Sequence, residues 1–228
     1  MIDCIDFVIT HKPYPIEQDD LYKKLCVGDY YDDISRSEHE GKNITQYNNR
    51  LNELTGLYWM WKNDRHEYVG LSHYRRFFGR DGHRIGADVI EDILVKDGFD
   101  IILSDYLQLP LPVNLNIRMA VGNDLYMEAF GNILRAMAHH QPEYENAFIS
   151  VLNGDRMYHK NMFVCRREIM ERFCEWLFSF MLEATDNVEV SGLSDHEKRV
   201  CGFFGEIMWT VWLWKNALKI CEMPIIRR

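Results

Sequence analysis

The sequence lacks the features that mark several large classes of protein. No stretch reaches the roughly 18 uninterrupted apolar residues of a membrane-spanning helix. The first residues, MIDCIDFVITHKP, have neither the basic start nor the long apolar run of a secretory signal. Internal repeats, low-complexity tracts and linkers rich in proline, glycine or serine are also missing. We therefore expect one folded unit in the cytoplasm, built around a first core strand near the amino end.

Paired cysteines and a surplus of positive charge are absent as well. The six cysteines are scattered without a Cys-x-x-Cys pair, and most have apolar neighbours. These spacings do not suit zinc and favour reduced thiols in a cytosolic protein. The net charge of -9 argues against a general nucleic-acid binder, although local basic sites are still allowed.

The residues that are present indicate an α/β protein. Apolar residues make up 47% of the 228 positions and aromatic residues 13%, enough for a sizeable core. Apolar runs predict strands, and apolar residues three or four positions apart predict helices. Because strands and helices alternate, we expect a single α/β domain over residues 1–228, with a mostly parallel sheet flanked by helices. The predicted strands are Ile5–Thr10, Tyr68–Ser72, Phe99–Ser104 and Asn161–Cys165. The predicted helices include Asn48–Trp61, Asp124–Met137, Glu143–Leu152, Ile169–Phe180 and a last one around Phe203–Val211. Residues 13–48 are expected to be irregular, and Leu107–Asn116 to be a loop because Pro110 and Pro112 block regular structure.

The segment Asn43–Phe78 carries the most informative pattern. A helix with polar residues at its start leads into a short apolar strand that ends in His73, Tyr74, Arg75 and Arg76. Open α/β sheets bind ligands at this carboxyl edge. Residues two apart on a strand share a face, so His73 and Arg75 should point together and Tyr74 and Arg76 the opposite way. The guanidinium group of arginine can donate two parallel hydrogen bonds, which suits a diphosphate. The alternative to diphosphate binding is that the two arginines form ion pairs with surface carboxylates.

Two further segments could meet a ligand at the same edge. Thr10, His11 and Lys12 follow the first strand, and Lys12 could hold a phosphate or lie in solvent. The polar start of the first helix offers free backbone N–H groups, and its side chains could bind a base or sugar. Simple helix capping is the alternative for each of those side chains. The polar side chains are Asn43, Asn48, Asn49, Asn52 and Glu53.

One carboxylate stands out as a general base. Gly205-Glu206 lies within or near the start of the last helix, where Glu206 could accept a proton from a hydroxyl nucleophile. Asp105, Asp155 and Asp195 are competing carboxylates, and a solvated glutamate on a helix is the structural alternative.

Six motifs, taken in order, resemble the bacterial family catalogued as domain of unknown function 4422, whose members are similar to capsular and exopolysaccharide glycosyltransferases. The resemblance covers nearly the whole chain, and its ELTGLYW…WKN…VGLSHYRR block is the most specific part. The motifs are THKP at Thr10–Pro13, NI at Asn43–Ile44, NELTGLYWMWKN at Asn52–Asn63, YVGLSHYRRFF at Tyr68–Phe78, KNMFVCRRE at Lys160–Glu168 and GFFGEIMWTVWL at Gly202–Leu213.

The resemblance implies a nucleotide-sugar transferase with a Rossmann-like, GT-A-type domain. Residues 1–105 would form the nucleotide-sugar-binding half and residues 106–228 the acceptor half. Many enzymes of this type carry an Asp-x-Asp metal motif where this chain has Ser72–Arg75. We therefore expect no metal or other cofactor, with His73 and Arg75, helped by Arg76, neutralising the leaving diphosphate.

The resemblance also implies roles for other residues. Many inverting GT-A enzymes have, in this order, a strand, a helix that begins with Arg-Arg-Glu and a later helix that begins with an acidic residue. This chain shows the same order, which supports Glu206 as the catalytic base by analogy. Family relatives include galactofuranosyltransferase candidates, so UDP-galactofuranose is one expected donor. Acceptor contacts are expected from Asp155 and Asn161. The nucleotide-sugar contacts expected are Thr10, His11, Lys12, Asn43, Glu53, Thr55, His73, Tyr74, Arg75 and Arg76.

The expected partners are a UDP-sugar donor and a glycan or lipid-linked glycan acceptor at the inner face of the plasma membrane. Peripheral attachment there would fit, although no basic amphipathic helix marks it. Three rival interpretations stay open: a phosphoryl-handling hydrolase, a silent nucleotide- or sugar-binding module, and a metal-dependent transferase with Asp105 as ligand. The sequence leaves the oligomeric state open.

Overall fold

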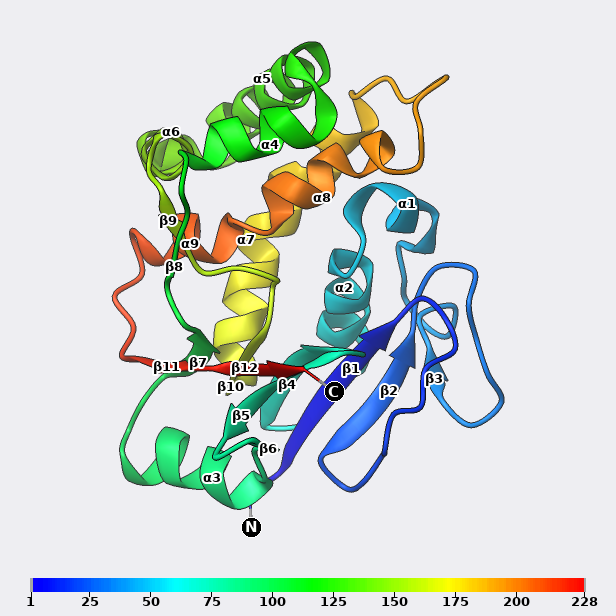
Figure 1. Cartoon of the computed structure of the whole chain (residues 1–228), viewed down its shortest axis with the longest axis vertical. Helices are drawn as coiled ribbons and strands as arrows, with labels where there is room; N and C mark the ends of the chain where they lie inside the picture. The colour runs from blue at the N-terminus through cyan, green and yellow to red at the C-terminus, as the bar shows by residue number, and fades with distance from the viewer. Residues whose placement is uncertain (1, 228) are drawn as a thin grey trace.

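The computed structural model describes residues 2–227 and has an α/β fold (Figure 1). Apolar strands form the centre of its main sheet. The four predicted strands are confirmed with adjusted ends as β1 (Cys4–Thr10), β4 (Tyr68–His73), β7 (Ile101–Ser104) and β10 (Phe163–Arg166). The strand order is β11-β7-β10-β4-β1-β2-β3. Only β10 runs antiparallel to its neighbours on this path. The expected mostly parallel sheet is therefore present among the described residues.

Helices bury both faces of the sheet, which explains why its strands are apolar almost throughout. On β1, Phe7 and Ile9 point into the larger core with α2 (Leu54–Asn63) and α7 (Arg167–Asp186). Val8 points the other way, into a smaller core with α3 (Ala87–Glu91) and η2 (Asp92–Lys96). β7 and β10 divide their side chains in the same way.

The remaining helices pack at one end of the molecule. Figure 1 shows α4 (Val113–Val121), α5 (Asn123–His140) and α6 (Glu145–Asn153) gathered there, with α8 (Val200–Gly205) between them and the sheet. The predicted last helix is interrupted at Glu206 and Ile207 and continues as α9 (Met208–Leu213). The predicted first helix is also divided, because Asn52 takes a left-handed φ of 52° between α1 (Asn48–Leu51) and α2. The short turns are η1 (Thr45–Tyr47), η3 (Pro142–Tyr144) and η4 (Glu197–Arg199).

Several elements lie where loops were predicted. The irregular region 13–48 contains β2 (Tyr22–Cys26), parallel to β1, and β3 (Arg36–Ser37). The loop predicted through Pro110 and Pro112 ends early, since α4 begins directly after Pro112. The other short strands are β5 (Arg76–Arg80), β6 (His83–Arg84), β8 (Leu107–Gln108), β9 (Arg156–Met157), β11 (Ile220–Met223) and β12 (Ile225–Arg227).

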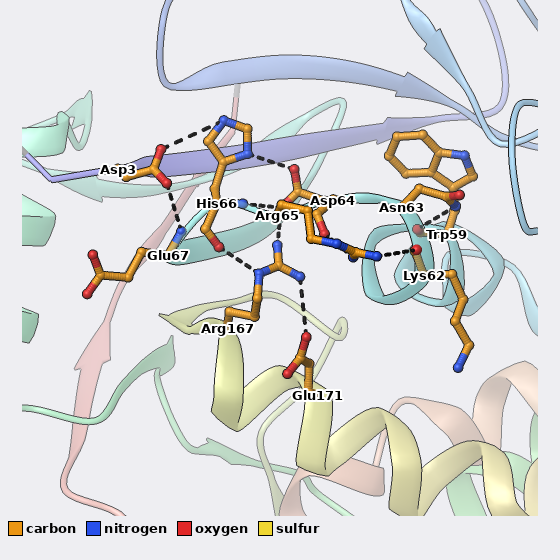
Figure 2. Close-up of polar contacts among 10 residues, drawn as sticks. All are labelled: Asp3, Trp59, Lys62, Asn63, Asp64, Arg65, His66, Glu67, Arg167 and Glu171. Atoms are coloured by element: carbon orange, nitrogen blue, oxygen red, sulfur yellow. Dashed lines mark hydrogen bonds and ion pairs between the residues drawn. The ribbon is translucent and has the colours of Figure 1, made fainter.

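A partly buried polar network stabilises the sheet at the amino ends of β1 and β4. Figure 2 shows His66 between Asp3 and Asp64, with Arg167 reaching across from the start of α7. The His66 Nδ1 lies 2.7 Å from Asp64 Oδ1, and Arg167 Nε donates to the His66 carbonyl at 2.8 Å. Arg167 also pairs with the Asp64 carboxylate, whose side chain is only 1% exposed. The two most buried charges, Asp64 and Arg167, pair with each other, so the network holds α2, β4 and α7 together at the edge opposite the carboxyl ends of β1 and β4.

The described residues include no helix with the length and apolar character needed to cross a membrane. All six cysteines are free thiols, and four of them are buried.

Candidate functional site

A polar cleft of about 680 Å³ lies at the carboxyl ends of β1 and β4. The two strands are parallel, so the segments after Thr10 and after His73 meet at one edge of the sheet. Lys160 reaches the same edge because it precedes β10, which runs antiparallel to β4. The break between α1 and α2 and the end of α8 complete the walls, which include Glu53 and Glu206.

The basic tetrad lies in this cleft, but the predicted alternation of its side chains is wrong. The chain reverses at Tyr74 and Arg75, and His73 pairs with Arg76 across an antiparallel hairpin between β4 and β5. All four residues consequently line the cleft. Tyr74 is buried and supports the two cations beside it: the Arg75 guanidinium lies 4.9 Å from its ring centre and the Lys12 ammonium 5.5 Å.

His73 does not supply the positive charge expected of it. Its side chain is 14% exposed, and burial lowers its pKa to about 4, so the imidazole is neutral near pH 7. Its Nε2 lies 2.6 Å from the Lys160 carbonyl oxygen. A neutral imidazole must therefore donate Nε2–H to that carbonyl. His73 positions the Lys160 segment and is not a cation for a diphosphate.

The positive charge of the cleft comes from five other side chains. Three of them, Lys12, Arg75 and Arg76, belong to the predicted set, whereas Lys160 and Arg199 were not predicted. No ion pair joins any of the five to a carboxylate within residues 2–227. The buried Nε of Arg76 has no hydrogen-bond partner in the part of the chain that the structure describes. These five cations outnumber the three carboxylates of the cleft, in a chain of net charge -9.

Arg199 is held in place by the break between α1 and α2. Its Nε donates to Asn52 Oδ1 at 2.6 Å, and Asn52 itself lines the cleft. Gly202 lies beside this pair, where a Cβ would come within 2.2 Å of the Asn52 amide nitrogen. No local sequence pattern links Arg199 to the basic tetrad, because 123 or more positions separate them along the chain.

Two carboxyl groups face these cations. Glu53 is 12% exposed, accepts a hydrogen bond from Asn161 Nδ2 at 3.3 Å and lies 3.9 Å from His73 Nε2. Glu206 directly follows Gly205, where a Cβ would lie 2.5 Å from Leu54, so the glycine allows α8 to approach α2. Burial raises the pKa of both carboxyls, and the charge of Glu53 raises that of Glu206 further. A carboxylate that binds protons more tightly than usual is well suited to general-base chemistry.

Three of the predicted nucleotide contacts, Thr10, Thr55 and Asn43, do not line the cleft and make hydrogen bonds within the protein. Thr10 is fully buried and its hydroxyl donates to the Lys12 carbonyl at 2.6 Å. Thr55 is fully buried; its hydroxyl accepts a hydrogen bond from the Asn48 side-chain amide and donates one to the Asn52 carbonyl. Asn43 accepts hydrogen bonds from Thr45 and does not line the cleft. His11 does line the cleft, and burial together with the neighbouring cations lowers its pKa.

The predicted acceptor residues have different places. Asp155 lies on the β8–β9 side, where its carboxylate accepts a hydrogen bond from Gln108 at 2.8 Å, and it does not line the cleft. Asn161 is 2% exposed and adopts a left-handed φ of 54° that turns its amide toward Glu53. Asn161 therefore supports a cleft carboxyl and is not itself exposed to a ligand.

Residues 2–227 hold one group of three side chains with metal-ligand geometry, and it lies outside the cleft. The group is His139, His140 and Glu183, all exposed on α5 and α7. Asp105 is exposed and is not part of the cleft lining. The third cleft carboxylate, Asp195, is 99% exposed and pairs with Lys198 at 3.1 Å.

Comparison with solved structures supports the same architecture. The chain is similar to the apo structure of the bifunctional glycosyltransferase WbbM, with a TM-score of 0.77 and 24% sequence identity. The similarity covers 99% of this chain but only 45% of that one, so the chain spans less than half the length of that protein. At this identity the likeness shows a shared fold. No curated protein matches the chain.

Comparison with family models decides the membership of the chain. Residues 6–217 match the model described as domain of unknown function DUF4422. This range begins within β1 and contains the basic hairpin, Lys160, Arg199 and Glu206, and so every residue that lines the cleft. The chain belongs to the DUF4422 family.

Proposed function

We propose that this protein is a glycosyltransferase that moves a sugar from a nucleotide diphosphate donor, UDP-linked, to a hydroxyl of a glycan or lipid-linked glycan acceptor. The observation that carries the proposal is the group of five cations, without ion-pair partners among residues 2–227, that shares one cleft with Glu206. A fold shared with part of a glycosyltransferase supports it. UDP-galactofuranose is the donor we favour, on the family resemblance alone.

The cations would hold the diphosphate. Arg75 and Arg76 lie at the end of β4 and Lys12 just after β1, and Lys160 and Arg199 line the same cleft. A diphosphate leaving group gains negative charge as its bond to the sugar breaks, and fixed cations stabilise that charge without reorganisation. In this proposal protein side chains do the work of a divalent metal. Residues 1–105 supply most of the donor site, and residues 106–228 supply the base and the acceptor side.

Glu206 would act as the base. The acceptor hydroxyl gives its proton to the Glu206 carboxylate while its oxygen bonds to the anomeric carbon. The bond between that carbon and the diphosphate oxygen breaks, and its electron pair leaves with UDP. Attack from the face opposite the diphosphate would invert the anomeric configuration. Glu53 and Lys160 tune Glu206 from opposite directions, because the first raises its pKa and the second lowers it.

Transfer at the inner face of the plasma membrane, with the protein attached peripherally, completes the proposal. A lipid-linked acceptor would be met there.

A panel of nucleotide sugars tested by thermal shift, with and without manganese, identifies the donor. We expect one UDP-sugar to raise the melting temperature in the presence of a chelator. Glu206→Gln should bind that donor unchanged and lose transfer to acceptor by at least about 100-fold. Donor binding with unchanged transfer in this variant would remove Glu206 as base, and donor binding without any transfer by the parent protein would favour a binding module.

A further inference from the structure

A second pocket, of about 200 Å³, lies beside the cleft and meets it at Lys160 and Glu206. We call it the α4 pocket because one face of α4 forms a wall. The lining positions of α4 recur three or four residues apart, from Val113 through Ile117 to Ala120. Phe203 of α8 also lines the pocket.

The α4 pocket is apolar away from its border with the cleft. Among the described residues that line it, Asn116 and His159 are the only other polar side chains. The Asn116 amide already donates to the carbonyls of Leu111 and Pro112. His159 lies 3.2 Å from the Ser104 hydroxyl, and burial lowers its pKa to about 4, so it is uncharged near neutral pH.

An apolar occupant therefore fits this pocket better than a charged or heavily hydroxylated one. Hydroxyl groups moved from water into it would lose hydrogen bonds without full replacement. A mostly apolar lining with a few polar groups at one side is typical of sites that orient a ligand by its polar end. Here the polar end is the border with Lys160 and Glu206.

We propose that the α4 pocket receives an apolar substituent of the acceptor, next to the hydroxyl that attacks the donor. The inference rests on the proposed function, since Glu206 marks where that hydroxyl must lie. It adds the chemical class of the acceptor: a sugar that carries an alkyl or acyl group close to its reacting hydroxyl. An alkyl group would come from a lipid aglycone, and an acyl group from a substituent on the sugar ring.

Methyl-resolved NMR tests the pocket without requiring catalysis. The probes are n-octyl β-D-glucopyranoside below its micellar concentration, N-acetylglucosamine and glucose. The methyl signals of Ile117 and Met157, which both line the pocket, should shift saturably with the first or second probe and not with glucose. Response to octyl glucoside alone assigns the alkyl source, and response to N-acetylglucosamine alone assigns the acyl source. No response to any probe, or an equal response to glucose, would overturn the proposal.

A matched pair of variants on α4 provides the control. Ala120 is exposed and lines the pocket, so Ala120→Phe should fill its mouth without disturbing the core. Met119 is the neighbouring residue, 76% exposed and outside the pocket lining. Ala120→Phe should abolish the methyl shifts, and Met119→Phe should leave them intact. Equal behaviour of the two variants would show that the probes bind elsewhere and would overturn the proposal.

Kinetics of the same variants separate this proposal from the function itself. Ala120→Phe should leave UDP affinity within about twofold of the parent and raise the acceptor KM at least about tenfold, as expected for loss of about 1.4 kcal/mol of acceptor binding. An unchanged acceptor KM, with UDP bound normally, would refute the α4 pocket as an acceptor site. Failure of the parent protein to bind UDP would instead refute the proposed function, and the acceptor assignment with it.

Discussion

Asp6 offers a quantitative test of the sheet that positions the cleft. It lies in the middle of β1 and is 1% exposed. One carboxylate oxygen accepts a hydrogen bond from the Ser72 hydroxyl at 2.9 Å, and the other is buried without a partner. Burial raises its pKa from 3.8 to about 8, although Ser72 and Arg84 oppose the rise. The folded protein therefore keeps Asp6 protonated at pH values where the unfolded chain ionises it.

The sign and size of the effect follow from linkage. Between about pH 4 and pH 8 the folded state binds more protons than the unfolded state, so the free energy of unfolding falls as pH rises. The slope is about 1.4 kcal/mol per pH unit, or about 4 kcal/mol between pH 4 and pH 7. Asp6→Asn, which resembles the protonated form, should remove this dependence. The parent's stability relative to Asp6→Asn should be greatest in acid and fall toward pH 8.

Urea unfolding at a series of pH values measures this difference directly. Asp20→Asn is the matched control, because Asp20 is exposed in the loop between β1 and β2, shortly before β2 begins. The difference between the parent and Asp20→Asn should stay within about 0.5 kcal/mol across the range. If the parent and Asp6→Asn keep a constant difference from pH 5 to pH 8, the buried carboxyl is not protonated and the reasoning is refuted.

Two further predictions concern the cleft and its support. Arg76→Met should weaken UDP binding by about 10- to 100-fold in calorimetry, through loss of a charge-assisted hydrogen bond. Arg80→Met, at the exposed far end of β5, should leave UDP affinity unchanged. An equal loss of affinity in both variants would show that Arg76 has no specific role. Gly205→Ala should cost about 1–3 kcal/mol in urea unfolding, because its Cβ would overlap buried Leu54. Gly131→Ala, with open space around its Cβ inside α5, should gain about 1 kcal/mol; a gain at Gly205 would contradict the packing argument.

The sequence predicted the central strands because both faces of the sheet are buried. β1, β4, β7 and β10 are apolar runs with few interruptions. β2 was missed because Lys23 and Lys24 break its apolar pattern. In the structure Lys24 is only 7% exposed and forms an ion pair with Asp32 at 2.8 Å. No pattern in the neighbouring sequence predicts this contact. α4 was missed because Pro112 suggested a loop, although proline is tolerated at a helix start.

The cleft was only partly predictable for a related reason. Strand ends identified Lys12, Arg75 and Arg76, because the carboxyl edge of a sheet is set by strand direction. The hairpin at Tyr74 and Arg75 carries no glycine, proline or asparagine, so side-chain alternation was wrongly extended through it. Lys160 and Arg199 reach the cleft through tertiary packing, which residue spacing does not reveal. The neutral state of His73 depends on burial and equally required the structure.

The central claim is that protein cations hold the donor's diphosphate, and calorimetry of UDP against uridine in the presence of a chelator tests it most directly. Two charge-assisted hydrogen bonds to the diphosphate predict that UDP binds at least about 100-fold more tightly than uridine. The affinity for UDP should also fall as salt is added. Binding of UDP that appears only when manganese is supplied, or that equals the binding of uridine, would contradict the claim.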